Sequence, residues 1–290
     1  MIVITGPTGQ IGGQLLARMI DGEELIRVIV RDPARLPAGI RERVDVVQGS
    51  YRERDVVMKA FDGADAVFWL PIADPAAATA EVAFVDMSRP VAEAIAHHGV
   101  RHVVSVSALG RGWPKDAGHA TASIHMDDML AETGAAFRAL ACPSLMDNML
   151  RQAASIRDQG VFYWPTPGDF KVPQVATRDV ADAAAKLLLD RSWSGAADLP
   201  LLGPENLSCN DQARIMSKVL QMPVEFREMP LEDMKLMMLA RGASEGMAQA
   251  MIDMAAAKNE GLDHMIPRTA ENTTPTSFVT WCESVLKPAV

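Results

Sequence analysis

A glycine-rich turn between an apolar strand and a helix, near the start of the chain, is the feature that most constrains the fold. Ile2-Val-Ile4 is a short β-branched run, and the segment GPTGQIG, residues 6–12, follows almost directly. Residues 25–30 are a second apolar run. The apolar positions that recur at helical spacing between them are Leu15, Leu16, Met19 and Ile20. This order predicts strand, glycine turn, helix and strand, a βαβ unit of about thirty residues.

The glycines of this turn indicate a nucleotide site. Gly6 and Gly9 allow the backbone to turn tightly and to approach a pyrophosphate, and Gly12 allows the helix to pack closely on its strand. The start of the helix adds free N–H groups and the positive end of the helix dipole. A flexible turn is the alternative for an isolated glycine triplet; in this context we expect a dinucleotide. The expected cofactor-binding residues of the turn are Gly6, Thr8, Gly9, Gln10, Ile11 and Gly12.

The end of the second strand bears on which dinucleotide binds. An acidic side chain there usually holds the ribose 2′-hydroxyl, whereas a 2′-phosphate requires an arginine. This chain has Arg31 at that point and Arg35 as a second candidate cation. Asp32 could be taken for the ribose ligand, but it directly precedes Pro33 and is more simply explained as the N-cap of a short helix. The sequence therefore favours NADP(H) over NAD(H).

Composition limits the classes of protein to which the chain can belong. Its 290 residues are 49% hydrophobic, enough for one large α/β domain or for one domain with a smaller appendage. A net charge of −9 argues against a nucleic-acid surface and against binding to anionic membranes. The chain contains no run of about eighteen apolar residues, so we expect no membrane span. The three cysteines are far apart and the start has no signal-peptide pattern, so we expect a reduced, cytoplasmic protein.

Further along the chain, strands alternate with helices. Strands are expected at 44–47, 66–70 and 100–106, and helices at 54–61, 79–98 and, after a loop at 111–122, up to about 133. This alternation predicts an α/β fold with a doubly wound parallel sheet of the Rossmann type. We expect residues 1–152 to form this NAD(P)-binding domain, to which the helix at 178–190 returns, and residues 153–290 to form a smaller, mostly helical C-terminal part. Leu70 should lie beside the cofactor, because ligands in open parallel sheets bind at the carboxyl ends of strands.

Several segments resemble one protein family. GPTGQIGG, with the spacing G-x-x-G-x-x-G, resembles the fingerprint of the atypical short-chain dehydrogenases, in particular the NmrA-like branch of regulators, quinone reductases and isoflavone-reductase-like enzymes. Residues 142–148, CPSLMDN, resemble the R-P-G-x-F-M-E-N segment of that family without its arginine. Residues 177–181, TRDVA, resemble its D-V-A helix start, and residues 202–205, LGPE, resemble its next turn, after which Ser208 and Asp211 predict a capping box. The resemblance extends over nearly the whole chain.

The catalytic pair usual in short-chain dehydrogenases is absent. Those enzymes place Tyr and Lys at Y-x-x-x-K after the fifth strand, as general acid and as the cation that lowers its pKa. The only tyrosines here, Tyr51 and Tyr163, lie elsewhere in the chain. The remaining candidates are Ser107, at the position of the family's substrate-binding serine, and two histidines, His125 on the following helix and His119 in the loop before it, as proton donors. A serine that only ends a strand and a polar residue on a helix face are the plainer alternatives.

The last third of the chain is rich in methionine. Met234, Met238, Met247, Met251 and Met254 recur at helical spacings in two segments expected to be amphipathic and split by Gly242 and Gly246. Ordinary core is the plain interpretation. Methionine also lines adaptable apolar pockets, and the family places its substrate cleft against this part, so some of these side chains could cover an apolar or aromatic substrate.

Other chemistries find little support in the sequence. The histidines at 97, 98 and 102 do not make a metal site, because Gly99 interrupts the helix between them and no carboxylate or cysteine completes the set. We therefore expect no metal. The chain has neither a G-x-S-x-G nucleophile elbow nor a P-loop lysine, which argues against hydrolase and kinase chemistry.

Two functions remain open. The first is an NADPH-dependent reductase of an apolar or aromatic carbonyl, enone or quinone, in which direct hydride transfer would need little acid catalysis. The second is a non-catalytic, NADP(H)-sensing NmrA-like regulator that binds a protein partner. The missing tyrosine and lysine favour the sensor, whereas the methionine-rich part favours the enzyme. We favour the reductase, with a small apolar or aromatic substrate, and leave a homodimer or a protein partner open.

Overall fold

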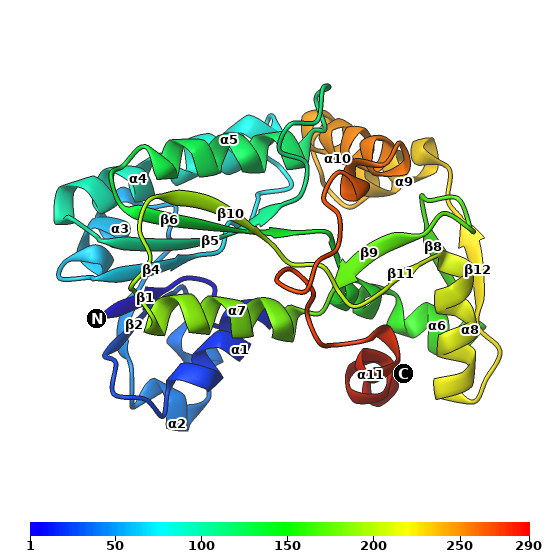
Figure 1. The fold of residues 1–290 in the computed structure, drawn as a ribbon, viewed down its shortest axis with the longest axis horizontal. Helices are drawn as coiled ribbons and strands as arrows, with labels where there is room; N and C mark the ends of the chain where they lie inside the picture. The colour runs from blue at the N-terminus through cyan, green and yellow to red at the C-terminus, as the bar shows by residue number, and fades with distance from the viewer.

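The computed structural model describes residues 1–290 and shows a large central sheet with helices on both faces and a smaller part beside it (Figure 1). The sheet has seven strands in the order β10-β6-β5-β4-β1-β2-β3, and all its strand pairs are parallel. Its strands are β1 (Ile2–Ile4), β2 (Ile26–Val30), β3 (Asp45–Gln48), β4 (Ala66–Trp69), β5 (His102–Ala108), β6 (Ala136–Cys142) and β10 (Ala196–Pro200). The predicted doubly wound Rossmann sheet is confirmed. The strand order reverses between β1 and β4, which is where such sheets bind ligands.

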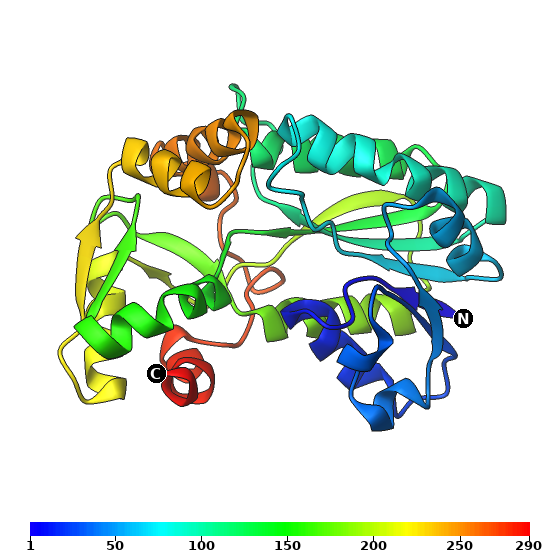
Figure 2. The same cartoon turned by 180° about the vertical axis from the view of Figure 1, so that it is seen from behind.

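Helices cover both faces of this sheet (Figures 1 and 2). One face carries α1 (Gln10–Met19) and α7 (Thr177–Leu189), and the other carries α3 (Arg54–Phe61), α4 (Met87–His98) and α5 (His119–Ala131). Because successive strand residues point to opposite faces, Ile2 and Ile4 pack in the core beneath α1 and α7, whereas Val3 packs beneath α3, α4 and α5. The short helices η1 (Pro33–Arg35) and α2 (Ala38–Arg41) follow β2.

The helix expected at 79–98 has an irregular first half. Residues Val82–Asp86 form a π-helical turn, η2, before α4 continues to His98. Pro90 lies inside α4 and has no N–H, so it cannot donate the usual bond to the carbonyl of Asp86. A π turn next to this proline is consistent with that lost bond. Gly99, with φ of 63°, ends the helix as expected.

The loop expected to run from 111 to 122 is shorter than the sequence suggested. Helix α5 begins at His119, so the placement of His119 in a loop was wrong. Gly118, with φ of 54°, precedes the helix, and a Cβ atom there would lie 1.9 Å from the carbonyl oxygen of Ala250. The early start therefore depends on a close backbone approach that only glycine allows and that involves a segment far away in the sequence.

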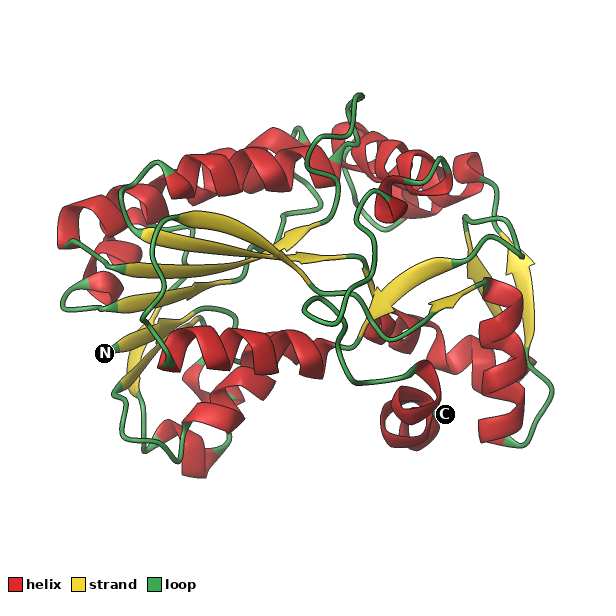
Figure 3. Cartoon of the chain, in the orientation of Figure 1, coloured by secondary structure: helices red, strands yellow, loops and turns green.

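The smaller part contains helices and two small sheets (Figure 3). A three-stranded sheet has the order β11-β9-β7 and a two-stranded sheet pairs β12 with β8. The strands are β7 (Ser144–Leu145), β8 (Val161–Trp164), β9 (Val172–Val175), β11 (Asn206–Leu207) and β12 (Glu225–Glu228). The helices are η3 (Met146–Gln152), α6 (Ala153–Gln159), α8 (Cys209–Leu220), α9 (Leu231–Ala240), α10 (Glu245–Asn259), η4 (Leu262–His264), α11 (Phe278–Trp281), η5 (Cys282–Leu286) and η6 (Lys287–Ala289).

The chain returns to the large sheet after it has entered the smaller part. Helix α7 packs along α1, and β10 pairs with β6 as an edge strand. The boundary near residue 152 stays a prediction. The segments that resemble the family motifs carry the contacts between these regions, since the Asp147 carboxylate accepts a 3.0 Å bond from the N–H of Thr177 at the start of α7. The Asp179 carboxylate accepts bonds from the N–H and hydroxyl of Thr276, and the predicted capping box of Ser208 and Asp211 is confirmed.

The two methionine-rich helices differ in burial. Helix α10 buries Met247 and several small or branched side chains, whereas α9 has no fully buried residue and leaves Leu236 63% exposed. The expectation that both segments are amphipathic was wrong, because neither helix gathers its apolar side chains on one side, and Gly246, expected to separate the segments with Gly242, lies inside α10. At the start of α10, a Cβ atom on Gly246 would lie 2.0 Å from the carbonyl oxygen of Ala78, so this glycine lets the helix lie directly on the loop after β4.

The structure has no helix that combines the length and the apolar character needed to cross a membrane.

Candidate functional site

The glycine turn after β1 has the tight geometry that its sequence predicts. Gly6 has φ of 63°, in the left-handed region, and a Cβ atom there would lie 2.9 Å from Cδ2 of Leu70. A Cβ atom on Gly12 would lie 2.2 Å from the carbonyl oxygen of Gly6, so no other residue fits there without movement of the backbone. The N–H of Gly9 donates a 3.0 Å bond to the same oxygen. The turn is therefore closed on itself, and α1 starts directly against it.

The start of α1 offers unpaired hydrogen-bond donors. Gly9 is the N-cap residue and has no side chain to satisfy the first N–H groups of the helix. Within the turn, only the N–H groups of Gly9 and Gly13 donate hydrogen bonds to the protein, to the carbonyls of Gly6 and Gly9. No acceptor within the protein pairs with the N–H groups of Thr8, Gln10, Ile11 and Gly12. Unpaired N–H groups at a helix N-terminus are the usual ligands of phosphate oxygens.

Two arginines that follow β2, one directly and one in η1, lack partners. The side chains of Arg31 and Arg35 are exposed, form no ion pair and donate no hydrogen bond. The Asp32 carboxylate, in contrast, accepts a 3.0 Å bond from the N–H of Ala34, and the prediction that Asp32 caps a short helix beginning at Pro33 is confirmed. Two arginines without partners, next to an aspartate that caps a helix, suit the binding of a ribose 2′-phosphate.

Leu70 lies against the glycine turn, as its place at the end of β4 suggested. Its N–H donates a 2.8 Å bond to the hydroxyl oxygen of Thr5, whose own proton is donated to the carbonyl of Phe68. These bonds hold the end of β4 to the end of β1. The geometry thus brings Leu70 and Gly6 together at one edge of the sheet.

Tyr51, which the sequence did not mark as a site residue, also lies at this edge. Its ring packs edge-on against Trp69 with centroids 5.4 Å apart, and burial raises the pKa of its hydroxyl. The neighbouring Arg52 forms a 2.6 Å ion pair with Asp74 and so ties the loop after β3 to the loop after β4. The only sequence signal for Tyr51 was its position just after a strand of a parallel sheet.

Ser107 meets a buried carboxyl group at the end of β5. Its hydroxyl donates to Oδ2 of Asp127 and lies 3.3 Å from the hydroxyl oxygen of Ser123. Both partners are on the inner face of α5, one helical turn apart. Asp127 is 1% exposed and its Oδ1 atom has no hydrogen-bond partner, whereas Ser107 is 8% exposed. The sequence analysis missed Asp127, and its i,i+4 spacing from Ser123 was the one signal available.

The environment of Asp127 favours its neutral form. Burial raises the pKa of this carboxyl to about 7, against the opposing effects of the Ser107 and Ser105 hydroxyls. The nearest cation, Arg111, forms ion pairs of 2.6 Å with Asp198 and 2.7 Å with Asp128, so its charge is largely compensated. A substantial fraction of Asp127 therefore holds a proton at neutral pH.

The two candidate histidines occupy different faces of α5. His119 lies two helical turns before Asp127 on the same face, and its Nε2 atom is 3.1 Å from the carbonyl oxygen of Met247. Burial lowers the pKa of His119, so its imidazole is neutral at pH 7. His125 lies on the outer face, half-exposed, with Nδ1 2.6 Å from a carboxylate oxygen of Glu81. The structure brings Ser107 to Asp127 and does not bring it to His125.

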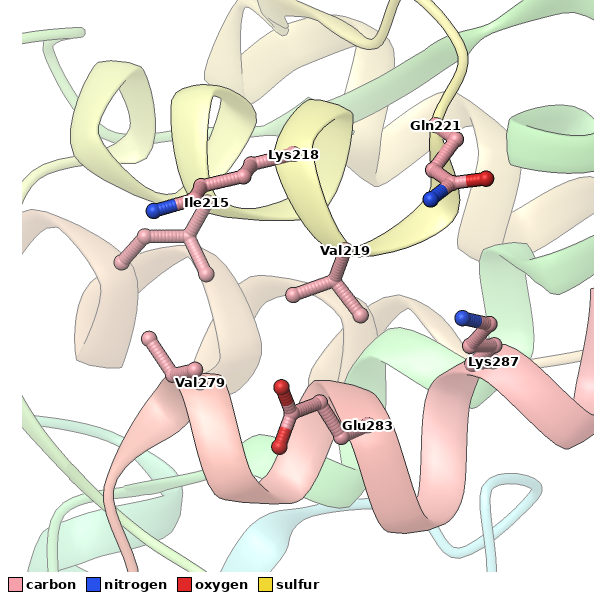
Figure 4. Close-up of a pocket in the computed structure, with 7 residues that line it drawn as sticks. All are labelled: Ile215, Lys218, Val219, Gln221, Val279, Glu283 and Lys287. Carbon is pink, nitrogen blue, oxygen red and sulfur yellow. The ribbon is translucent and has the colours of Figure 1, made fainter.

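Two hollows stand apart from the glycine turn. One, of about 610 Å³, lies between α5 and α10 and includes His125, Trp113 and Asp253 in its lining. The other, of about 400 Å³, lies between α8 and the C-terminal helical segment, with Lys218 and Glu283 among its seven lining residues (Figure 4). None of the expected cofactor-binding residues lines either hollow. The expected cofactor site therefore lies at the ends of the strands and not in either hollow.

Comparison with known proteins gives matches over most of the chain. The model of a family described as NAD(P)H-binding matches residues 6–191. The (4-alkanoyl-5-oxo-2,5-dihydrofuran-3-yl)methyl phosphate reductase of Streptomyces griseus is 30% identical, over 94% of this chain and 93% of that protein. The NAD(P)H azoreductase of Xenophilus azovorans is 27% identical, over 88% and 86% of the two chains.

A solved structure shares the fold. The NADPH-dependent quinone oxidoreductase of Escherichia coli, complexed with NADPH, superposes with a TM-score of 0.77 at 22% identity, over 96% of this chain and 97% of that one. The matches fit the resemblance to NmrA-like atypical short-chain dehydrogenases drawn from residues 6–12, and they support a general class of NAD(P)H-dependent reductases.

Proposed function

Because the chain belongs to the NAD(P)H-binding family, we propose that it is an NADPH-dependent reductase of an apolar or aromatic carbonyl, enone or quinone. The observation that carries this proposal is the closed glycine turn with its unpaired N–H groups at the start of α1, and two unpaired arginines follow β2, the strand that pairs with β1. These groups suit the pyrophosphate and the 2′-phosphate of a bound NADPH. The reduced nicotinamide supplies the hydride in such a reaction.

Arg31 and Arg35 support NADPH over NADH. Neither side chain is committed to another group, so binding a phosphate would not break an existing ion pair. The carboxylate nearest to them in sequence, Asp32, caps η1 through Oδ1, which gives this acidic residue a role that needs no ribose hydroxyl. Guanidinium groups bind phosphate oxygens in a bidentate geometry, and Arg31 is the more direct candidate because it directly follows β2.

The apolar substrate class rests on two observations. The names of the two sequence relatives specify an azo compound and an unsaturated furanone ring, and the related structure is named a quinone oxidoreductase. In this chain, the half-buried Met254 of α10 packs against a buried apolar cluster that includes Leu109, the residue just beyond β5, the strand that carries Ser107. A thioether and a branched side chain suit a flat, conjugated ring better than a charged one.

The test is a scan of NADPH oxidation by the purified protein against menadione, chalcone, acetophenone and the azo dye methyl red. We expect steady oxidation with at least one of these compounds, and tighter binding of NADPH than of NADH in calorimetry. The variant Gly9→Val serves as the control for a requirement for bound cofactor. Tight NADPH binding without oxidation in the presence of any of the four would overturn the reductase and favour the NADP(H)-sensing regulator.

A further inference from the structure

We propose that Asp127 supplies the proton for the reduction, acting through the hydroxyl of Ser107. This inference rests on the proposed function and deepens it, because it assigns the proton that a chain without Y-x-x-x-K must obtain elsewhere. Packing between α5 and the sheet does not need a carboxyl group at position 127. A buried carboxyl group with an unpaired oxygen is costly to keep in a core unless it does something that an apolar side chain cannot do.

The position of Ser107 suits contact with a substrate. In the sheet, Ser105 of β5 is level with Trp69 of β4, so Ser107 lies two residues beyond, at the edge where Leu70 meets the glycine turn. The carboxyl ends of parallel strands form the ligand-binding edge of such sheets. Ser107 keeps some exposed surface there, whereas Asp127 behind it has almost none. The Ser107 hydroxyl is therefore the group that a substrate can reach, and the Asp127 carboxyl is placed to replace the proton that the hydroxyl gives up.

The charged groups around Asp127 leave it without a committed cation. Arg111, in the loop after β5, bonds Asp198 on β10 and Asp128 on α5. On α5 itself the neighbouring inner-face group is the neutral hydroxyl of Ser123, and His119 further along is held by the carbonyl of Met247. Asp198 is a like charge that disfavours ionisation of Asp127. The groups packed around the carboxyl thus leave a substantial fraction of it protonated at neutral pH.

The proton transfer balances with the hydride. In the unliganded structure the Ser107 hydroxyl donates to Oδ2 of Asp127, so with substrate bound it must turn to the substrate oxygen, and the protonated Oδ2 of Asp127 then donates to the oxygen of Ser107. As hydride reaches the substrate carbon, the substrate oxygen gains negative charge and takes the Ser107 hydroxyl proton, forming an O–H bond. The serine oxygen takes the proton of the Asp127 carboxyl, so that its O–H bond breaks and a carboxylate remains. The two electrons come from the hydride donor, and solvent returns one proton to Asp127 before the next turnover. Ser107 is then the group in contact with substrate, and Asp127 is the residue that restores its proton.

The chain offers a matched control for the test. Asp128 is the next residue, an exposed carboxylate on the same helix that pairs with Arg111 and does not contact Ser107. We compare Asp127→Asn and Asp128→Asn with the unaltered protein for kcat, for its pH profile and for NADPH affinity. For Asp127→Asn we expect kcat for acetophenone or chalcone to fall about a hundredfold, the usual contribution of a positioned acid, at unchanged NADPH affinity. The loss should be smaller for menadione, because a quinone needs less acid catalysis.

The pH profile separates a proton source from a structural role. A carboxylic acid must hold its proton to donate it, so kcat of the unaltered protein should fall as pH rises through about 7, and Asp127→Asn should lose that fall. Ser107→Ala combined with Asp127→Asn should lower kcat no further than either change alone, since the two groups act in series. In the unliganded protein, an infrared band of a protonated carboxyl group should titrate near pH 7 and be missing only from Asp127→Asn.

The outcomes distinguish this inference from the proposed function. If the unaltered protein reduces a probe and Asp127→Asn matches Asp128→Asn in kcat and pH profile, the proton relay is wrong and the reductase stands. If the carboxyl band is the same in both variants, the relay is likewise wrong. If NADPH binds and no probe is reduced, the reductase fails and the relay fails with it.

Discussion

The two ends of the site, the glycine turn and the Ser107–Asp127 pair, are built in opposite ways. The turn is made of backbone: its donors are N–H groups, its shape depends on the absence of side chains at Gly6 and Gly12, and it spans seven consecutive residues. The pair is made of side chains on a strand and a helix, 20 residues apart in sequence, and one of them is a buried acid. The first end is defined by backbone geometry, and the second by a buried carboxyl group whose pKa is raised.

This difference has a thermodynamic consequence. A glycine turn costs backbone entropy but leaves few buried polar groups without water or a partner. A buried carboxyl costs desolvation of its charged form, and this cost raises the pKa of Asp127 to about 7. Changes at the turn should therefore alter ligand affinity with little effect on folding, whereas changes at the pair should alter stability and its dependence on pH.

The largest expected effect is on stability, in Asp127→Asn. An aspartate in an unfolded chain has a pKa of about 3.9, whereas the pKa of Asp127 in the folded protein is about 7. Between these values the folded state binds the proton more tightly, so the stability of the unaltered protein falls as pH rises through this window. Asparagine cannot ionise, and the variant should gain up to about 4 kcal/mol over the unaltered protein between pH 4 and pH 8. Urea unfolding at the two pH values measures this gain.

Asp128→Asn is the control for that measurement. It removes a neighbouring carboxylate that is 53% exposed and ion-paired, so its effect should stay below about 1 kcal/mol and change little with pH. An equal gain in stability for the two variants would show that Asp127 is not a buried acid. The glycine turn and the Ser107–Asp127 pair would then no longer differ in how they affect stability.

The second effect, in Gly9→Val, is on cofactor binding. A Cβ atom on Gly9 would lie 3.4 Å from the carbonyl oxygen of Gly6, an ordinary contact, and Gly9 has φ of −92°, so the fold should survive. The branched side chain would occupy the space of the phosphate oxygens and should weaken NADPH binding about a hundredfold, or about 2.7 kcal/mol. Calorimetric titration measures the NADPH affinity, and thermal unfolding shows whether the variant is folded.

Gly39→Val is the control, because Gly39 lies in the short helix α2 and its added Cβ atom would have no neighbour within 4 Å. It should change neither the NADPH affinity nor the unfolding temperature. Native affinity in Gly9→Val would show that the phosphate site lies elsewhere.

The contrast explains how much the sequence could predict. The turn, the Asp32 cap and the Rossmann sheet follow from local patterns, because glycine spacing, capping residues and apolar periodicity act over a few neighbouring residues. The start of α5 at His119 and the exposure of α9 do not, since they depend on contacts with distant segments such as Ala250. Asp127 and Asp128 are adjacent acids, and the sequence pattern selected neither; only the register of α5 against β5 buries the first and exposes the second.

A third, smaller effect concerns the choice of cofactor. If Arg31 binds the 2′-phosphate, NADPH should bind at least about tenfold more tightly than NADH, or about 1.4 kcal/mol, and Arg31→Asp should abolish or reverse this preference. Arg41→Asp is the matched control, because Arg41 is also exposed and unpaired but lies on α2, beyond the end of η1. Calorimetric titration of each protein with both nucleotides gives the ratio. Equal affinities for NADPH and NADH in the unaltered protein would leave the turn as a pyrophosphate site without specificity for the added phosphate.

The smallest effect is expected for His125→Phe, and it tests whether the chemistry belongs to the inner or the outer face of α5. From the sequence alone His125 was the nearest proton donor, and its loss would then cost about a hundredfold in turnover. In the structure it pairs with Glu81 on the outer face, two residues and therefore about 200° around the helix from Ser123 and Asp127. A proton held there has no direct path to Ser107, so His125→Phe should change kcat less than about twofold, or about 0.4 kcal/mol. NADPH oxidation with a reduced probe measures this, and a loss of a hundredfold would move the proton source to the hollow between α5 and α10 and make Asp127 a structural acid.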